Sequence, residues 1–294
     1  MMIDLPIRRG YDGPNRVSTS QFLRMRPLWL NYDGSEKLTD FQVKCVLTPS
    51  DIPFEKLRAD KQDLLFVDNN NEPIPYWIEQ ADSTEIIVWL KFSEIIPGKE
   101  VFWLYYGNRN FSGASDGFAT FEFFDDFEDG DVSDWENPIA ITTNAYQGQY
   151  AAKVPAGSDP HPRKPFTYDS DIVIEWAGNS EDGAGYCGVE IFDSSGNWIR
   201  WSFTADLDKM WIESNLFSKV SASQTFDGNT WYNFKAIYKT NGYMSIEYEG
   251  NILKTTQTYI TPNKLGLSRA GSYDELYDIV RVRKYTSPEP SVSV

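Results

Sequence analysis

The densest group of ionisable side chains in the sequence is the segment 121–131, in which six carboxylates are mixed with phenylalanines. Closely spaced carboxylates can bind Ca²⁺, which takes oxygen ligands in proteins. The same composition is typical of a solvated turn, because charged side chains stay in water unless they are paired. The spacing differs from that of a helix-loop-helix calcium loop, since the glycine and the closing glutamate lie elsewhere. A turn and part of a calcium site both stay open as interpretations.

Hydrolysis of a glycosidic bond requires two carboxyl groups that face the same cleft. Acidic residues at alternate positions of one strand satisfy this, because alternate side chains point to the same face. Glu247 and Glu249 have that spacing, but a solvated strand face explains them more simply. Glu175 has no acidic residue two positions away, and Glu190 and Asp193 have the wrong spacing. The sequence therefore indicates a protein that is not an enzyme, and a polysaccharide hydrolase or the accessory binding module of one is the lesser alternative.

Aromatic residues make up 15% of the chain, with 10 Trp and 17 Tyr. Most of them must fill β-sheet cores, but a few exposed rings could stack against sugar rings. The candidates lie near turns or beside polar residues: Trp198, Trp201, Trp211 and Tyr243, with Arg200 as a donor to sugar hydroxyl groups. Trp198 and Trp201 are three positions apart, so an unbroken strand exposes at most one of them.

The composition also excludes several function classes. His161 is the single histidine, which removes His-based zinc sites and Ser-His-Asp triads. The net charge is −16 and no run of Lys or Arg stands out, which disfavours nucleic acid as a partner. Cys45 and Cys187 lie on opposite sides of the acidic segment, so free thiols are expected.

No stretch of the sequence is long and apolar enough to predict a membrane span, and a membrane partner is not expected. Residues 1–22 also lack the apolar core of a signal peptide, so we expect a chain without a secretion signal.

Short alternating segments separated by turn residues run through the chain, and no window shows an apolar period of 3.6 residues. This pattern predicts an all-β protein with two antiparallel β-sandwich domains. Residues 1–24 are expected to be an extended arm, 25–118 the first sandwich, and 119–294 the second.

The first sandwich carries the segments DLLFVDNNNEPIPYWIE (residues 63–79) and IIVWLKFSEIIPGKEVFWLYYGN (residues 86–108). This order resembles the domain of unknown function 2341, a β-sandwich module of multidomain surface proteins of archaea and bacteria, over roughly residues 26 to 117. The final strand, which runs into Tyr105-Tyr106-Gly107-Asn108, is its most specific part. The family carries no agreed catalytic residues, so the resemblance implies no site.

The second half resembles a concanavalin A-like jelly roll, as in laminin G-like modules, lectins and laminarinase-type enzymes. The resemblance rests on the acidic opening before Trp135, the segment Trp231-Tyr-Asn-Phe and the last strand, 277–282. In that family an aspartate near the end often binds a structural Ca²⁺ together with backbone carbonyls from the start of the domain. The resemblance therefore implies Asp278 as a Ca²⁺ ligand, with Asp126 or the Gly148 carbonyl as companions. A polar strand residue that faces water is the alternative.

Together these expectations describe a non-catalytic surface adhesion protein with a lectin-like domain, which binds a glycan on a host cell surface. The combination indicates a virion component of a prokaryotic virus, such as a tail, fibre or capsid-decorating protein, located on the virion or an extracellular surface. The alternative is an architectural subunit that assembles with virion proteins or as a homo-oligomer, with the arm 1–24 docked on a neighbouring chain.

Overall fold

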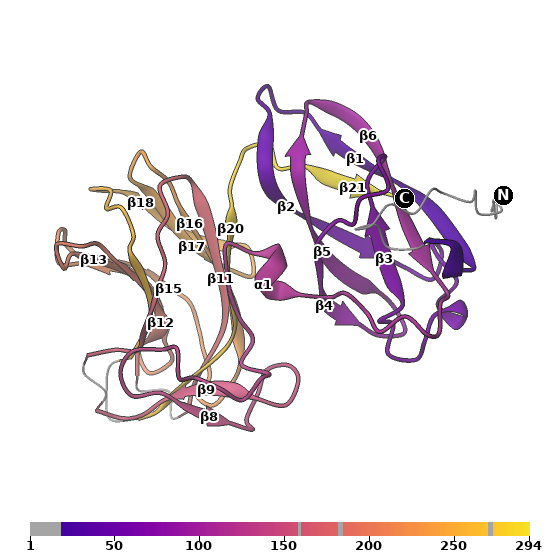
Figure 1. Ribbon diagram of the computed structural model, residues 1–294. Coiled ribbons are helices and arrows are strands. Elements are labelled where there is room, and N and C mark those ends of the chain that lie inside the picture. Colours follow the sequence, from indigo (N-terminus) through magenta and orange to yellow (C-terminus); the bar gives the residue numbers. More distant parts are fainter. Residues whose placement is uncertain (1–18, 158–159, 182–184, 270–272) are drawn as a thin grey trace. The chain divides into compact units, whose positions relative to one another are not determined.

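The computed structural model describes residues 19–294, apart from 158–159, 182–184 and 270–272 (Figure 1). The described chain is almost entirely strands in antiparallel sheets, as the sequence predicts. No helix in this part of the chain is long and apolar enough to cross a membrane. The arm expected at residues 1–24 lies outside the described residues up to residue 18, and a short 3₁₀ helix, η1 (Thr19–Gln21), follows.

The described chain forms two compact units. Unit 1 contains the residues up to Phe121 together with Thr286–Val294, and unit 2 contains Glu122–Tyr285. The chain therefore leaves unit 1 once and later returns to it, so that unit 2 is an insertion in unit 1. The sequence predicts one domain from residue 119 onward, whereas Thr286–Val294 belong to unit 1, because a short last strand gives no sign of where it pairs.

Unit 1 contains two antiparallel sheets. One sheet has the order β21 (Ser291–Ser293), β1 (Arg24–Tyr32), β6 (Gly98–Tyr106) and β3 (Leu64–Val67). The other has the order β2 (Leu38–Leu47), β5 (Ile86–Ile95) and β4 (Tyr76–Ala81). The short helices η2 (Phe54–Lys56) and α1 (Gly117–Thr120) lie between strands in sequence. Both sheets contribute to one core, as shown by Leu28, Val43, Val88 and Leu104, all at most 2% exposed.

The last strand completes the sheet of unit 1. Leu30 pairs with Val292 in the register of β1 and β21, and Val292 and Val294 pack against the core of unit 1. We expect deletion of residues 286–294 to destabilise unit 1 by about 2 kcal/mol, because two valines lose their burial and β1 becomes an edge strand.

Calorimetric unfolding of the deletion variant checks this prediction. The transition of unit 1 should move to lower temperature, and Ser293→Ala, which removes only the hydrogen bond from Asn31 Nδ2 to Ser293 Oγ, should leave it nearly unchanged. Equal unfolding of the deletion variant and the full chain would show that β21 contributes nothing to unit 1.

Unit 2 also contains two antiparallel sheets. The six-stranded sheet has the order β10 (Arg163–Pro165), β19 (Lys264–Ser268), β12 (Cys187–Phe192), β13 (Trp198–Thr204), β14 (Lys209–Ser214) and β15 (Val220–Ser223). The eight-stranded sheet has the order β18 (Asn251–Thr256), β17 (Tyr243–Tyr248), β16 (Tyr232–Tyr238), β11 (Ile172–Ser180), β20 (Glu275–Lys284), β9 (Ala151–Val154) and β8 (Ala140–Thr142). The eighth strand, β7 (Phe123–Asp125), also pairs with β20.

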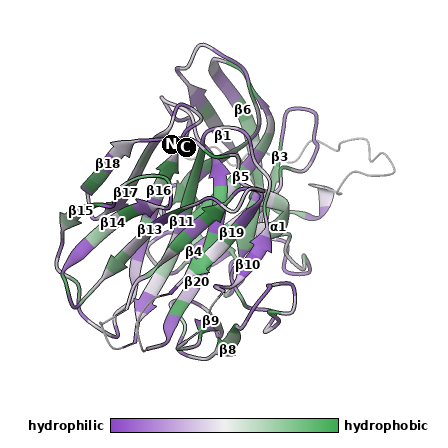
Figure 2. Cartoon of the chain, turned by 90° about the vertical axis from the view of Figure 1, so that its left-hand side faces the viewer, coloured by the Kyte–Doolittle hydropathy of each residue, from purple (hydrophilic) through white to green (hydrophobic). Residues whose placement is uncertain are grey.

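Aromatic rings from both sheets fill the core of unit 2. Trp176 stacks on Phe234 with ring centroids 5.2 Å apart, and Phe234 also stacks on Phe203 at 4.7 Å. Trp201 meets Tyr238 edge to face at 5.6 Å. Hydrophobic and hydrophilic residues follow one another along these strands (Figure 2). The alternation leaves one face of each sheet outside the core, and the candidate site lies on such a face.

Candidate functional site

One face of the six-stranded sheet carries a row of charged side chains. Glu190 of β12 pairs in register with Arg200 of β13, which pairs with Glu213 of β14. The next residue along β13, Trp201, belongs to the core. Because successive side chains of a strand point to opposite faces, the charged row lies on the face away from the core.

The charged row is a closed network of hydrogen bonds. Arg200 donates from Nε and Nη2 to Glu190 Oε2 at 3.1 and 3.0 Å, and from Nη1 to Glu213 Oε1 at 3.1 Å. Lys219 Nζ lies 3.3 Å from Glu213 Oε2, and His161 Nδ1 contacts Glu190 Oε1. A two-bond contact between a guanidinium and a carboxylate fixes orientation as well as charge.

Both partners in the centre of this network hold their charge. Burial raises the pKa of Glu190, but the hydrogen bond with His161 and the charge of Arg200 outweigh burial, and the pKa lies below its usual value. Burial lowers the pKa of Arg200, but the charges of Glu190 and Glu213 outweigh it, and the pKa is raised. Glu190 is therefore a carboxylate at neutral pH, unable to donate a proton to a substrate.

Two tryptophans flank the charged row. The guanidinium carbon of Arg200 lies 4.9 Å from the centroid of the half-buried Trp198 ring. Trp211 is 8% exposed, with Lys219 Nζ at 4.0 Å and Lys209 Nζ at 5.4 Å from its centroid. Lysine side chains thus cover Trp211, whereas Arg200 positions Trp198.

Trp198 borders a hollow of about 300 Å³. Its lining residues come from β10, β12, β13, β19 and the turns beside them: Arg163, Phe192, Asp193, Ser194, Gly196, Trp198, Asn263 and Lys264. The guanidinium of Arg163 lies 3.8 Å from the centroid of the Phe192 ring. Arg163 Nε and Asn263 Oδ1 have no hydrogen-bond partner. The hollow therefore combines aromatic rings with polar and charged side chains in its wall, whereas these two unpartnered atoms are buried.

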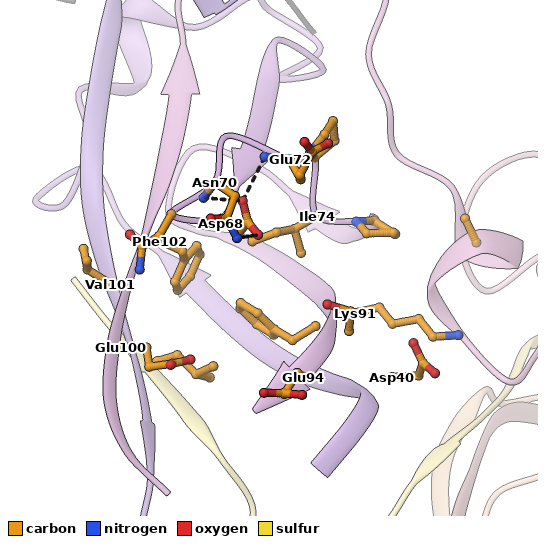
Figure 3. A pocket seen from close by; sticks show the side chains of 17 residues that line it. Asp40, Asp68, Asn70, Glu72, Ile74, Lys91, Glu94, Glu100, Val101 and Phe102 are labelled. Carbon is orange, nitrogen blue, oxygen red and sulfur yellow. Dashed lines mark hydrogen bonds between the residues drawn. The ribbon is translucent and has the colours of Figure 1, made fainter. Parts of the chain in front are cut away.

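Unit 1 has a larger hollow, of about 520 Å³ (Figure 3). Apolar side chains such as Phe92 and Phe102 line it together with five acidic residues: Asp40, Asp68, Glu72, Glu94 and Glu100. Asp68 accepts hydrogen bonds from the backbone N–H groups of Asn70 and Glu72, each at 2.8 Å. Lys91 is the single basic residue among its lining residues. An acidic hollow of this kind disfavours anionic ligands.

Residues 60–138 match the model of a family described as Domain of unknown function (DUF2341). The resemblance predicted from the sequence is confirmed for this segment, which runs from unit 1 into the first residues of unit 2. The matched segment supplies all residues that line the acidic hollow except Leu30 and Asp40. Among curated proteins, none matches the chain.

Three solved structures match part of this chain. The carbohydrate binding module CBM66 from Bacillus subtilis is 15% identical and has a TM-score of 0.43, over 51% of this chain and 96% of that chain. The cellulose induced protein Cip1 is 12% identical with a TM-score of 0.45, over 55% and 97%. A protein of unknown function with a galectin-like fold from Bacillus subtilis is 16% identical with a TM-score of 0.43, over 55% and 94%. The concanavalin A-like assignment stays a prediction.

The predicted ligand-binding residues separate in the structure. Trp198, Arg200 and Trp211 lie on one face of the six-stranded sheet. Trp201 is fully buried in the core and offers no ring face to a ligand, so its prediction as a binding residue is wrong. Its burial agrees with the expectation that at most one of Trp198 and Trp201 is exposed. Tyr243 lies on β17 of the other sheet, and Lys239 Nζ lies 5.2 Å from the centroid of its ring.

The residues implied as calcium ligands make different contacts. The Asp278 carboxylate is buried and accepts hydrogen bonds from the backbone N–H groups of Tyr146, Gln147 and Ile279, at 2.9, 3.0 and 2.8 Å. Peptide N–H donors do not fit a metal ligand set, and no group of three or more His, Cys, Asp or Glu side chains that could hold a metal ion occurs among the described residues. Calcium binding by Asp126, Gly148 and Asp278 therefore stays a prediction that these contacts do not support.

The acidic segment itself divides into a buried and a solvated part. Asp125 accepts hydrogen bonds from Trp135 Nε1 at 2.8 Å and from Lys164 Nζ at 3.2 Å. Asp129 and Asp131 are exposed and accept hydrogen bonds from backbone N–H groups two residues later, as in turns. The interpretation as a turn fits these contacts.

The other residues that line the hollow with Trp198 are not predictable from local sequence pattern. Arg163, Phe192, Asn263 and Lys264 come from three separate parts of the chain. Only Phe192 could be placed from the sequence, because it lies two positions after Glu190 and therefore on the same outward face of β12. The others depend on the pairing of β19 with β10 and β12, which no local pattern indicates.

Proposed function

We propose that unit 2 binds a neutral glycan, without cleaving it, in the hollow beside Trp198. One observation carries this proposal: a half-buried indole ring, positioned by Arg200, borders a hollow whose wall also holds the Phe192 ring and the polar residues Ser194 and Asn263. A sugar ring presents an apolar C–H face for stacking and hydroxyl groups for hydrogen bonds, which are the two complements of this site.

A glycan is a better fit than an anionic ligand. Lys264 Nζ lies 2.6 and 2.8 Å from the carboxylate oxygens of Glu136, and the turn that contributes Asp193 adds a carboxylate to the lining. The net charge of −16 also repels anions at a distance. Neutral hydroxyl groups avoid both penalties.

The carboxylates of the site do not support hydrolysis. A general acid of a glycosidase needs a raised pKa so that it carries a proton at the working pH. The pKa of Glu190 is lowered, and Arg200 bonds both Glu190 and Glu213. Burial raises the pKa of Glu275 to about 8 and that of Asp278 to about 7, but both side chains are fully buried and cannot reach a substrate.

A glycan array followed by calorimetric titration of the sugars it selects tests the proposal. We expect Trp198→Ala to weaken binding about tenfold, because loss of ring stacking costs about 1.5 kcal/mol. Tyr243→Ala, which removes a ring from the other sheet, is the matched control and should bind like the wild type. Silence of the wild-type protein on the array with and without Ca²⁺, or equal binding by Trp198→Ala, would contradict the proposal.

We also propose that the protein acts on the surface of a virion or cell. This location rests on the resemblance of the sequence to surface modules, and the match over residues 60–138 is to a domain whose function is unknown. Mass spectrometry of purified particles tests it: the chain should be present in stoichiometric amount.

The architectural alternative predicts a different result in solution. A subunit that assembles with itself should sediment as an oligomer at micromolar concentration without glycan, whereas a glycan-binding module has no such requirement. Assembly combined with silence on the array would favour the architectural role.

A further inference from the structure

We infer that Tyr146, Trp231 and Asn233 form a second sugar-binding platform in unit 2, which takes a neutral sugar ring independently of the hollow beside Trp198. These residues belong to the eight-stranded sheet and its loops, whereas the hollow belongs to the six-stranded sheet. The inference goes beyond the proposed function because it assigns a separate site with its own aromatic surface.

An exposed aromatic pair forms the platform. Tyr146 is 43% exposed, and its ring centroid lies 6.1 Å from that of Trp231, with the two ring planes inclined by 55°. Asn233, which is exposed on β16, donates from Nδ2 to the Tyr146 hydroxyl at 2.6 Å. Tyr146 is therefore exposed enough to contact a ligand, while Trp231 and Asn233 contact its ring and its hydroxyl group.

The loop that carries Tyr146 is anchored by two carboxylates. Asp278 accepts the backbone N–H groups of Tyr146 and Gln147, and Glu128 accepts those of Gln149 and Tyr150 at 2.8 Å each. Gly148, between these anchors, has a φ of 73°, and a Cβ there would lie 2.3 Å from Glu128 Oε1. The loop therefore presents Tyr146 in a fixed position, which reduces the ordering cost of binding.

The polar atoms around the pair suit hydroxyl groups. The Tyr146 hydroxyl accepts from Asn233 and can donate its own hydrogen to a ligand hydroxyl. Asn233 uses Nδ2 toward Tyr146, and its Oδ1 can accept a hydrogen from a ligand hydroxyl.

Charged side chains on the same face of the sheet pair with one another. Lys235 Nζ lies 3.9 Å from Glu247 Oε2, and Arg281 Nε and Arg283 Nε lie 2.8 and 3.6 Å from Glu175 Oε2. Three positive side chains thus face two carboxylates, which leaves only a small net charge, so the chemistry of the platform favours a neutral ring over a strongly charged one.

Affinity electrophoresis separates the two sites. The probes are three neutral polysaccharides, hydroxyethyl cellulose, galactomannan and laminarin, each cast in a native gel. The proteins are the wild type, Trp198→Ala, Tyr146→Ala, and the Trp198→Ala variant combined with either Tyr146→Ala or Tyr146→Phe. Tyr146→Phe keeps the ring and loses only the hydroxyl that accepts from Asn233. Near-ultraviolet circular dichroism confirms that each variant is folded.

The inference predicts that Trp198→Ala keeps part of its retardation by at least one polysaccharide. Adding Tyr146→Ala should reduce that residual affinity about tenfold, and adding Tyr146→Phe should preserve most of it. No residual retardation of Trp198→Ala, or equal retardation after Tyr146→Ala is added, would overturn the inference while the hollow beside Trp198 stands. Loss of retardation with Tyr146→Ala alone, together with wild-type behaviour of Trp198→Ala, would support the platform and overturn the proposed hollow. Absence of retardation of the wild type by all three polysaccharides would contradict both.

Discussion

Replacement of Arg200 by methionine is expected to lower the free energy of unfolding of unit 2 by about 3–5 kcal/mol. Arg200 bonds Glu190 twice and Glu213 once, and Glu190 is 1% exposed. Removal of the guanidinium leaves a buried carboxylate with His161 as its remaining partner among the contacts of this network. The cost is therefore the desolvation of an uncompensated charge rather than the strength of the ion pair itself.

A double-mutant cycle isolates that cost. The combination of Arg200→Met with Glu190→Met removes both charges, and we expect it to be less destabilising than Arg200→Met alone, as measured by urea unfolding. Lys37→Met is the matched control, because Lys37 pairs with Glu94 at 2.9 Å on the surface of unit 1, where both side chains are more than half exposed. That variant should change stability by less than about 0.5 kcal/mol. Equal costs for Arg200→Met and Lys37→Met would show that the charged row is not a structural network.

Replacement of Glu275 by glutamine is expected to remove a loss of stability that the wild type shows on going from acid to neutral pH. Burial raises the pKa of Glu275 to about 8; the charges of Glu181 and Asp274 also raise it, whereas the hydrogen bond with Ser180 and the charge of Arg269 lower it. The folded state therefore keeps a proton that the unfolded state releases above about pH 4.3. Since the folded state binds more protons in this interval, stability falls as the pH rises toward 8.

Urea unfolding at pH 5 and pH 8 measures the effect. The Glu275→Gln variant should be close to the wild type at pH 5 and more stable at pH 8 by about 2–4 kcal/mol, because glutamine stays neutral. Glu249→Gln, which changes an exposed carboxyl group of the same unit, should retain the slope of the wild type. Parallel pH profiles for Glu275→Gln and the wild type would mean that Glu275 does not hold a proton in the folded state.

Local sequence pattern predicts the strands and their inward faces well. Val189 and Ile191 alternate with Glu190 on β12, and the structure places the first two in the core and the third on the opposite face. The spacing of Trp198 and Trp201 likewise predicts that one ring is buried. Period-two patterns report which face of a strand is apolar, and that information is local.

Pairing between distant segments lies beyond such patterns. The row formed by Glu190, Arg200 and Glu213 exists because three strands share a register, and His161 reaches Glu190 from 29 positions away. The return of the last strand to unit 1 depends on its pairing with β1. The pairing of these distant segments depends on the free energy of the whole sheet, and the neighbouring residues in the sequence do not determine it.

Asp278 shows what a resemblance alone leaves undecided. The resemblance implies this aspartate as a Ca²⁺ ligand, and in the structure its carboxyl group accepts hydrogen bonds from the loop that carries Tyr146. A buried carboxyl group such as that of Asp278 suits both metal binding and the anchoring of a loop by hydrogen bonds. Only the identity of the neighbouring groups, peptide N–H donors instead of oxygen ligands, distinguishes the two.

The most direct test of the central claim is the nitrogen-15 spectrum of the indole N–H groups of the 10 tryptophans, recorded while a neutral oligosaccharide selected on the array is added. Comparison with Trp198→Phe assigns the Trp198 signal. A glycan-binding hollow predicts that this signal shifts and saturates at the dissociation constant found by calorimetry. Binding of the sugar with an unmoved Trp198 signal would contradict the account.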